Sequence, residues 1–164
     1  MTREEKFGFS KERFNEIFSY VDGKIYWKIK YSRKVIIGNE AGTLAGPENN
    51  KYVQVGLNGR KYKVHRIIYI MHNGFISGII DHKKGKLNHI ENLRECTQLQ
   101  NTHNRKLNKN SKTGIKGVTW CNTRNKYIAK LANRHLGYFY HKRKAEKEVV
   151  KVRNKYHGEF ARHS

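Results

Sequence analysis

The sequence predicts an α+β protein, in which short antiparallel sheets alternate with helices along one chain. Two observations lead to this fold class. The dipeptide Asn58-Gly59 separates two alternating runs in "KYVQVGLNGRKYKV", a pattern typical of a tight β-hairpin. Farther along, "IKGVTW", "KYIAKL" and "RHLGYF" indicate three short strands, and residues 142–157 then have the periodicity of an amphipathic helix.

Local patterns also predict the elements on either side of the hairpin. Ser10 is suited to cap a short helix, whose apolar residues have the i, i+3, i+4, i+7 spacing: Phe14, Ile17, Phe18 and Val21. "GKIYWKI" alternates like a strand, and "HRIIYIMHNG" predicts a mostly buried helix that ends at Gly74.

The next stretch, "IIDHKKGKLNHIENLREC", predicts a strand that ends in Asp81-His82, a loop, and a second short strand near residues 92–94. "TQLQNTHNRK" then predicts a helix that carries Asn101, and the polar "KLNKNSKTG" is typical of a linker. We therefore divide the chain into four parts: an accessory segment (1–51), a strand–strand–helix module (52–106), a linker (107–114) and a sheet-and-helix domain (115–162).

The charge of the chain points to an anionic partner. The 35 Lys and Arg residues against 13 Asp and Glu residues give a formal net charge of +22. Residues 95–164 hold 17 of the basic residues and only 4 of the acidic ones. Because basic surface gains affinity by releasing counterions from phosphates, nucleic acid is the predicted partner.

Other partners and compartments are disfavoured. The chain has no long apolar run and no basic amphipathic helix with an aromatic face, so we expect no membrane contact. The start, "MTREEKFGFSKERF", lacks the apolar stretch of a signal peptide. The two cysteines, Cys96 and Cys121, form no CxxC motif, which fits a reducing cytoplasm rather than a disulfide scaffold or zinc knuckle.

An acid, an imidazole and an amide in this order predict a hydrolytic site. Asp81 and Asn101 offer the hard oxygen ligands that Mg²⁺ or Mn²⁺ prefers, and two protein ligands leave positions for phosphate and water. His82 faces away from Asp81 along the strand, and an imidazole can deprotonate water near neutral pH. The residues therefore predict phosphodiester hydrolysis at a single metal ion.

Simpler explanations exist for each of these residues. An Asp-His pair alone is more often a surface hydrogen bond, so the prediction depends on Asn92 and Asn101 at matching distances. Asn92 either supports the loop of His82 or caps a turn, and Arg94 either contacts phosphate or braces the module. The last ligand is also ambiguous, since the same helix offers His103 and Asn104.

In these residues the chain resembles the HNH endonucleases of phages and introns. The elements that match are Asp81-His82, the central Asn92-Leu93-Arg94 and the later Asn101. The resemblance implies a ββα-metal fold and metal-dependent nicking or cutting of DNA. It assigns one divalent ion to Asp81 and Asn101, the general base to His82, and its support to Asn92.

The segment after the linker resembles an AP2-type DNA-binding domain, which often accompanies phage HNH modules. Matching residues include Gly117, Trp120 and Ala145, together with the closing "HGEFA". The resemblance implies that the sheet enters the major groove of double-stranded DNA. The residues expected to contact DNA across the whole chain are basic: Arg66, Arg94, Arg105, Lys116, Arg124, Lys126, Lys130 and Arg134.

The predicted function is therefore that of a small phage-type HNH endonuclease, either homing or free-standing, that acts as a monomer in the cytoplasm of a bacterial host. Its cofactor would be Mg²⁺ or Mn²⁺, with no small-molecule cofactor. A DNA-binding regulator with an inactive HNH-like module is the alternative from a different class. An RNA-binding accessory protein is a third, suggested by charge alone.

Overall fold

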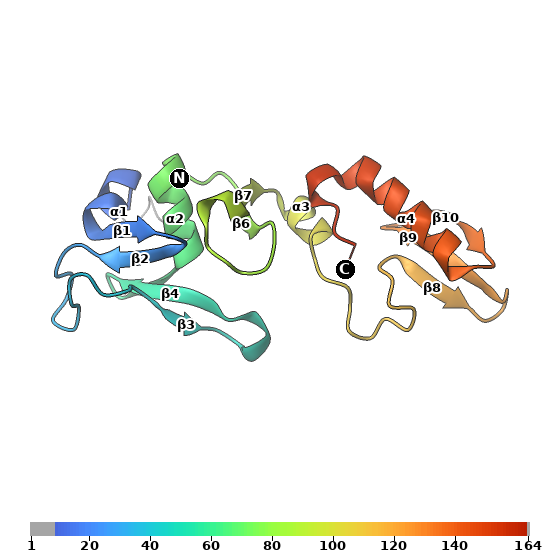
Figure 1. Cartoon of the computed structure of the whole chain (residues 1–164), viewed down its shortest axis with the longest axis horizontal. Coiled ribbons are helices and arrows are strands. Elements are labelled where there is room, and N and C mark those ends of the chain that lie inside the picture. The colour runs from blue at the N-terminus through green and yellow to red at the C-terminus, as the bar shows by residue number, and fades with distance from the viewer. Residues whose placement is uncertain (1–8, 164) are drawn as a thin grey trace. The chain divides into compact units, whose positions relative to one another are not determined.

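A computed structural model describes residues 9–163, and these residues form two compact units (Figure 1). One unit lies within Met1–Thr97 and the other within Gln98–Ser164. The mixture of helices and small antiparallel sheets confirms the α+β class. The boundary between the units divides the predicted 52–106 module, because it separates the strands from the helix of Asn101.

Within residues 9–97, the first unit contains two α-helices and three small sheets. Its elements in chain order are α1 (Lys11–Ile17), β1 (Phe18–Val21), β2 (Lys24–Trp27), β3 (Thr43–Ala45), β4 (Tyr52–Leu57), β5 (Arg60–Lys63), α2 (Val64–Asn73), β6 (Ile79–His82) and β7 (Leu93–Cys96). Short 3₁₀ turns occupy Glu48–Asn50 and Ile90–Asn92. The sheets are β1–β2, β3–β4–β5 and β6–β7, and all their pairings are antiparallel.

The first helix is shorter than the sequence predicts. The Ser10 side chain caps α1 and accepts a hydrogen bond from the Arg13 amide at 3.2 Å, as expected. The helix ends at Ile17, however, and the next four residues form β1, so the prediction that the helix continues to Val21 was wrong. The cause is pairing with β2 across a two-residue turn at Asp22-Gly23, where both φ angles are positive.

The hairpin and the second helix agree with the sequence. Asn58 and Gly59 have φ angles of 48° and 70°, the left-handed values that a two-residue hairpin turn requires. Helix α2 ends before Gly74, whose φ of 90° is costly for other residues. No pattern in the sequence predicted β3, which extends this sheet beyond the hairpin.

Helix α2 lies at the centre of the core of the first unit. Its buried residues pack with those of α1, β1, β2 and β4 in one cluster that includes Phe14, Ile25 and Ile67. Ile80 of β6 and Leu93 of β7 belong to the same cluster. The hairpin β6–β7 is therefore anchored by apolar side chains, and this anchoring decides which way its polar residues face.

The second unit is a three-stranded sheet with a helix on one face. Its elements are α3 (Gln98–His103), β8 (Val118–Cys121), β9 (Lys126–Leu131), β10 (Arg134–Phe139) and α4 (Lys142–His157), followed by a 3₁₀ turn at Gly158–Phe160. The sheet order is β10–β9–β8 (Figure 1). Val118 and Ala129 pack against Ala145 and Val149 of α4 in a small core. The predicted strands and helix of this region are confirmed.

None of the helices described is long and apolar enough to cross a membrane.

Gly117 allows a close backbone approach in the second unit. Its φ is +83°, and a Cβ added there would lie 2.5 Å from the carbonyl oxygen of Lys130. The carbonyl of Gly117 also accepts a hydrogen bond from the Lys130 amide at 2.8 Å. Any side chain at this position would push the start of β8 away from β9.

We expect Gly117→Ala to lower the free energy of unfolding of the second unit by about 3 kcal/mol, because it combines a left-handed backbone with a clash. Gly114→Ala is the matched control, since Gly114 has φ +67° but no atom near the added Cβ. It should cost about 1 kcal/mol. Urea unfolding measures both, and equal losses would show that the clash is relieved without cost.

Candidate functional site

The register of β6 and β7 sets the directions in which two polar residues of the predicted site point. Asp81 lies opposite Arg94, and His82 lies opposite Leu93. Ile80 and His82 are buried on one face of the strand, so Asp81 points to the other face. The hairpin therefore holds an acid and an imidazole on neighbouring positions with opposite directions.

Asp81 and Arg94 form an ion pair with little exposure to solvent. Oδ2 of Asp81 accepts hydrogen bonds from Nε and Nη2 of Arg94 at 3.3 and 3.2 Å. The side chains are only 12% and 9% exposed, respectively. Of the two roles considered for Arg94, the structure favours bracing over a DNA contact, because its guanidinium is buried against the carboxylate.

The chemistry of Asp81 fits a hard cation, but its surroundings supply few further ligands. Both contacts from Arg94 exceed the 2.7–2.9 Å that is typical of charge-assisted hydrogen bonds. Across residues 9–163, no group of three His, Cys, Asp or Glu side chains is placed to hold a metal. A cation at Asp81 would therefore depend on amide, phosphate and water oxygens.

The hairpin carries only one of the two predicted metal ligands. Asn101 is a half-buried residue of α3, which belongs to the second unit. Of the alternatives on the same helix, His103 stacks on His157 with ring centroids 3.6 Å apart. Its imidazole is thus engaged within the second unit. Asn104 is half-buried and follows the end of α3, and the choice between it and Asn101 stays a prediction.

His82 is held by a residue that the sequence analysis missed. Its ring is 8% exposed, and Nε2 lies 2.8 Å from Oδ1 of Asn88. Because an amide oxygen only accepts, Nε2 is the protonated nitrogen in this contact. Burial lowers the pKa of His82, although Asn88 and the charge of Asp81 act in the opposite direction. The net result favours the neutral imidazole, the form that can take up a proton.

Asn92 braces the loop between the two strands. Its side-chain oxygen accepts a hydrogen bond from the Lys84 amide at 2.9 Å. Its side-chain nitrogen donates to the carbonyls of Lys84 and Leu87 at 2.8 and 2.7 Å. One amide group thus ties together both limbs of the loop that contains Asn88, and its effect on His82 passes through the loop.

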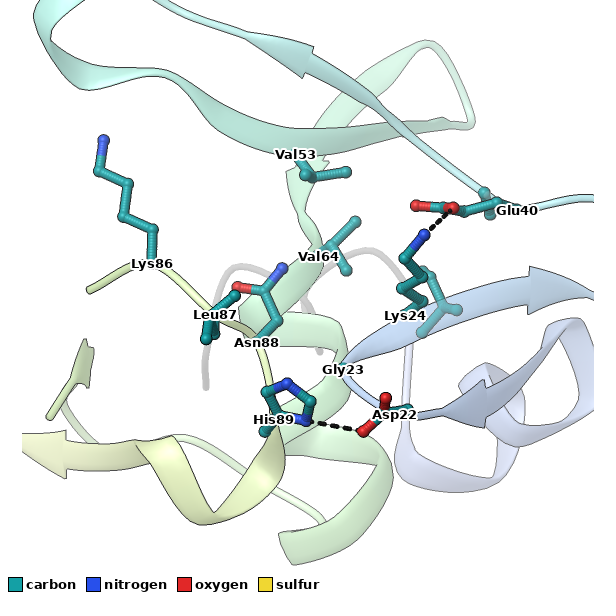
Figure 2. Close-up of a pocket in the computed structure, with 12 residues that line it drawn as sticks. Asp22, Gly23, Lys24, Glu40, Val53, Val64, Lys86, Leu87, Asn88 and His89 are labelled. Atoms are coloured by element: carbon teal, nitrogen blue, oxygen red, sulfur yellow. Dashed lines mark hydrogen bonds and ion pairs between the residues drawn. The ribbon is translucent and has the colours of Figure 1, made fainter. Parts of the chain in front are cut away.

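The same loop is also tied to the first hairpin. Nδ1 of His89 lies 3.0 Å from the Asp22 carboxylate, and the Ile90 amide donates to the Tyr20 hydroxyl at 3.2 Å. Figure 2 shows the pocket that the loop borders, with Lys86 and Asn88 among its lining residues. Its volume is ≈ 360 Å³.

A cluster of aromatic and basic side chains surrounds His82. Its ring centroid lies 4.9 Å from that of His65 and 6.3 Å from that of Tyr52. Two ammonium groups lie over the Tyr52 ring, Lys63 Nζ at 4.5 Å and Lys86 Nζ at 4.3 Å. The sequence analysis missed this cluster. The basic run "KYKVHR" was a signal for part of it, but Tyr52 and Lys86 come from distant segments.

His65 is a buried and uncharged histidine. It is 5% exposed, and its pKa is lowered to about 3, mainly by burial and then by the charges of His82, Lys63 and Arg66. Its position in the first turn of α2 puts it between the core and the cluster. Protonation of His65 would place a charge where water cannot reach it.

The residues of the second unit that are predicted to contact DNA fall into two groups. Lys116 Nζ donates to the carbonyls of His103 and Arg105, and Arg134 donates to the Tyr156 hydroxyl at 2.5 Å. Both side chains thus have partners within the unit, and their contacts with DNA stay a prediction.

The other group remains at the surface. Arg124 lies over the Tyr138 ring at 4.7 Å, and Lys126 lies over the Tyr140 ring at 4.3 Å. Lys130 is exposed on β9. Of the remaining candidates, Arg105 is exposed after α3 and Arg66 is half-buried in α2.

Comparison of the chain with protein-family models, curated proteins and solved structures finds no match.

Acid should destabilise the first unit through His65. Its pKa is about 6.5 in the unfolded chain and about 3 in the folded chain, so the unfolded chain binds the proton first. The stabilisation is present above pH 6.5 and is lost as the pH falls from 6.5 toward 3. By pH 5 the loss should be about 2 kcal/mol. His65→Gln should unfold with a shallower pH dependence, and identical slopes for the two proteins would contradict this.

Asn92→Ala should lower the free energy of unfolding by about 3 kcal/mol, because it removes three hydrogen bonds that hold the loop. Asn73→Ala is a suitable control, since it removes one exposed bond to the Tyr69 carbonyl. That change should stay within about 0.5 kcal/mol. If thermal or urea unfolding gave similar values for the two variants, the loop would not depend on Asn92.

Proposed function

We propose that the protein is a metal-dependent DNA endonuclease of the HNH type. The observation that supports this best is the pair Asp81 and His82, a half-buried carboxylate and a buried imidazole held on adjacent positions by separate partners. Arg94 orients the carboxylate, and Asn88 orients the imidazole. An imidazole whose pKa is lowered by burial, next to an oriented carboxylate, is typical of catalytic sites.

His82 would act as the general base that takes a proton from the attacking water. With Nε2 donating to Asn88, the proton-accepting atom of the neutral ring is Nδ1. Asn88 would fix the tautomer and the ring orientation, and Asn92 would keep Asn88 in place through the loop. The lowered pKa keeps the ring unprotonated at neutral pH.

Asp81 and Asn101 would hold one divalent cation, which when bound stabilises negative charge on the phosphate. Arg94 lies 3.2 Å from Oδ2 of this carboxylate and would orient it before the cation binds. The proposal for Asn101 rests on its residue type and on the HNH resemblance.

The second unit would supply most of the affinity for double-stranded DNA. Its surface carries the cation–aromatic pairs Arg124–Tyr138 and Lys126–Tyr140, and residues 95–164 hold 17 basic residues. Basic side chains neutralise phosphates, and bases or sugars can pack on the exposed rings. Binding should weaken steeply as salt rises, with a log–log slope of roughly −0.9 per neutralised phosphate.

The central test is incubation of supercoiled plasmid with the protein, in Mg²⁺ or in EDTA. We expect relaxed or linear product only with Mg²⁺. His82→Ala should slow cleavage by about 100-fold or more while DNA binding is kept, and Asp81→Asn should raise the Mg²⁺ concentration required. His141→Ala removes an exposed histidine and is the control. Cleavage by His82→Ala at the wild-type rate would remove it from this role.

A DNA-binding regulator without nuclease activity is the second candidate. The observation that favours it is that polar atoms of both predicted catalytic residues already have protein partners, Arg94 for Asp81 and Asn88 for His82. If the protein bound duplex DNA but gave no product in Mg²⁺ or Mn²⁺, this function would replace the endonuclease.

A further inference from the structure

We propose that Lys63 and Lys86, assembled on the ring of Tyr52, form a binding site for one DNA phosphate beside His82. The inference rests on the proposed endonuclease function and deepens it, because it names the residues that would position the phosphodiester next to the general base. None of these three residues follows from the motif Asp81-His82, Asn92 and Asn101.

The geometry brings the two ammonium groups to one aromatic ring. Lys63 is the last residue of β5, Lys86 belongs to the loop between β6 and β7, and Tyr52 begins β4. The Nζ atoms lie 4.5 and 4.3 Å from the centroid of the Tyr52 ring. This ring is itself 6.3 Å from the ring of His82 and nearly parallel to it, with 22° between the planes. Three segments that are distant in sequence thus converge beside the proposed base.

The second lysine is fixed by the backbone. Nζ of Lys86 donates a hydrogen bond to the carbonyl oxygen of Lys51 at 2.9 Å, which tethers the loop to the residue before β4. A lysine on a mobile surface stem loses rotamer entropy when it binds an anion, and this tether reduces that loss. Lys86 is therefore partly preorganised near Tyr52.

The positive charge of the cluster is not neutralised by the protein. Within residues 9–163, neither Lys63 nor Lys86 has a carboxylate partner. The pKa of Lys63 is lowered by burial, then by Arg66 and Lys86. Lys24 gives the contrast, because its ion pair with Glu40 at 2.7 Å raises its pKa. The charge of Lys86 disfavours the charged form of Lys63, and an anion close to both ammonium groups would offset this repulsion.

A phosphodiester suits this site better than other anions. It carries one negative charge and two non-bridging oxygens, so each ammonium can donate to a separate oxygen. The Tyr52 ring attracts both cations through its face, and its hydroxyl is not needed for this. A phosphate held by both lysines would lie close to His82, where a general base is required.

The first test measures phosphate binding directly and does not depend on catalysis. The imidazole signals of His65 and His82 in the full chain are followed by NMR during titration with a short DNA duplex in EDTA, and separately with inorganic phosphate. We expect the duplex to shift both signals. Lys63→Gln/Lys86→Gln should abolish the shifts, whereas Lys30→Gln/Lys34→Gln, which removes two exposed lysines of the same unit, should preserve them. Shifts that persist in the first double variant would overturn the proposal.

The two probes distinguish the source of the phosphate. Saturation by the duplex, with much weaker shifts from inorganic phosphate, would support a backbone phosphate of DNA. Equal or tighter binding of inorganic phosphate would overturn that assignment, because the site would then recognise a free anion.

The second test follows cleavage of plasmid with saturating enzyme. Each substitution, Lys63→Gln or Lys86→Gln, should slow cleavage about tenfold, the value of one charge-assisted hydrogen bond. Tyr52→Phe should be nearly unchanged, and Tyr52→Leu should lose rate like a lysine variant, because the ring and not the hydroxyl holds the ammonium groups. If Tyr52→Leu and both lysine variants cleaved at the wild-type rate, the site would not act in catalysis. If the wild type cleaved nothing but the NMR shifts were seen, the endonuclease proposal would fail and the phosphate site would stand.

Discussion

The pairing register of β6 with β7 is the constraint on which the rest of the site depends. Ile80 and Leu93 lie in the core of the first unit, and their burial fixes which face of the hairpin points inward. A slip of one residue would exchange the faces, which would expose His82 and bury Asp81 away from Arg94. The apolar core thus determines the directions of the acid and the imidazole.

The loop between these strands is the second constraint on the position of His82. Asn92 closes it from within, His89 ties it to Asp22, and Lys86 ties it to the backbone of Lys51. The loop in turn presents Asn88 to His82. Positive charge gathers near His82, because Lys63 and Lys86 both act to lower its pKa.

Much of the fold was predictable because local signals were strong. The Asn58-Gly59 turn, the helix that ends before Gly74, and the strands and helix of the second unit each depend on patterns within about ten residues. Phe18–Val21 was predicted as helix because its apolar spacing also fits a helix, and only pairing with β2 decides for a strand. Strand β3 has no sequence pattern of its own and forms by antiparallel pairing with β4.

The candidate site was predictable only in part, for a related reason. The motif located Asp81, His82 and Asn92, because short-range spacing identifies them. Asn88 as the partner of His82, and the convergence of Tyr52, Lys63 and Lys86, depend on how three distant segments fold together. Similarly, Arg94 is buried and Lys116 donates a hydrogen bond within the second unit. Both follow from tertiary packing, which the positions of basic residues in a sequence do not indicate.

A crystal structure of the protein with a DNA duplex and Ca²⁺ would show whether Asp81 and His82 act on a bound phosphate, because Ca²⁺ takes the same oxygen ligands as Mg²⁺. We expect one ion bound by the Asp81 carboxylate and the Asn101 amide oxygen, with a DNA phosphate against the ring of His82. A duplex bound only to the second unit, with Asp81 still paired to Arg94 and no ion beside it, would rule out this metal site.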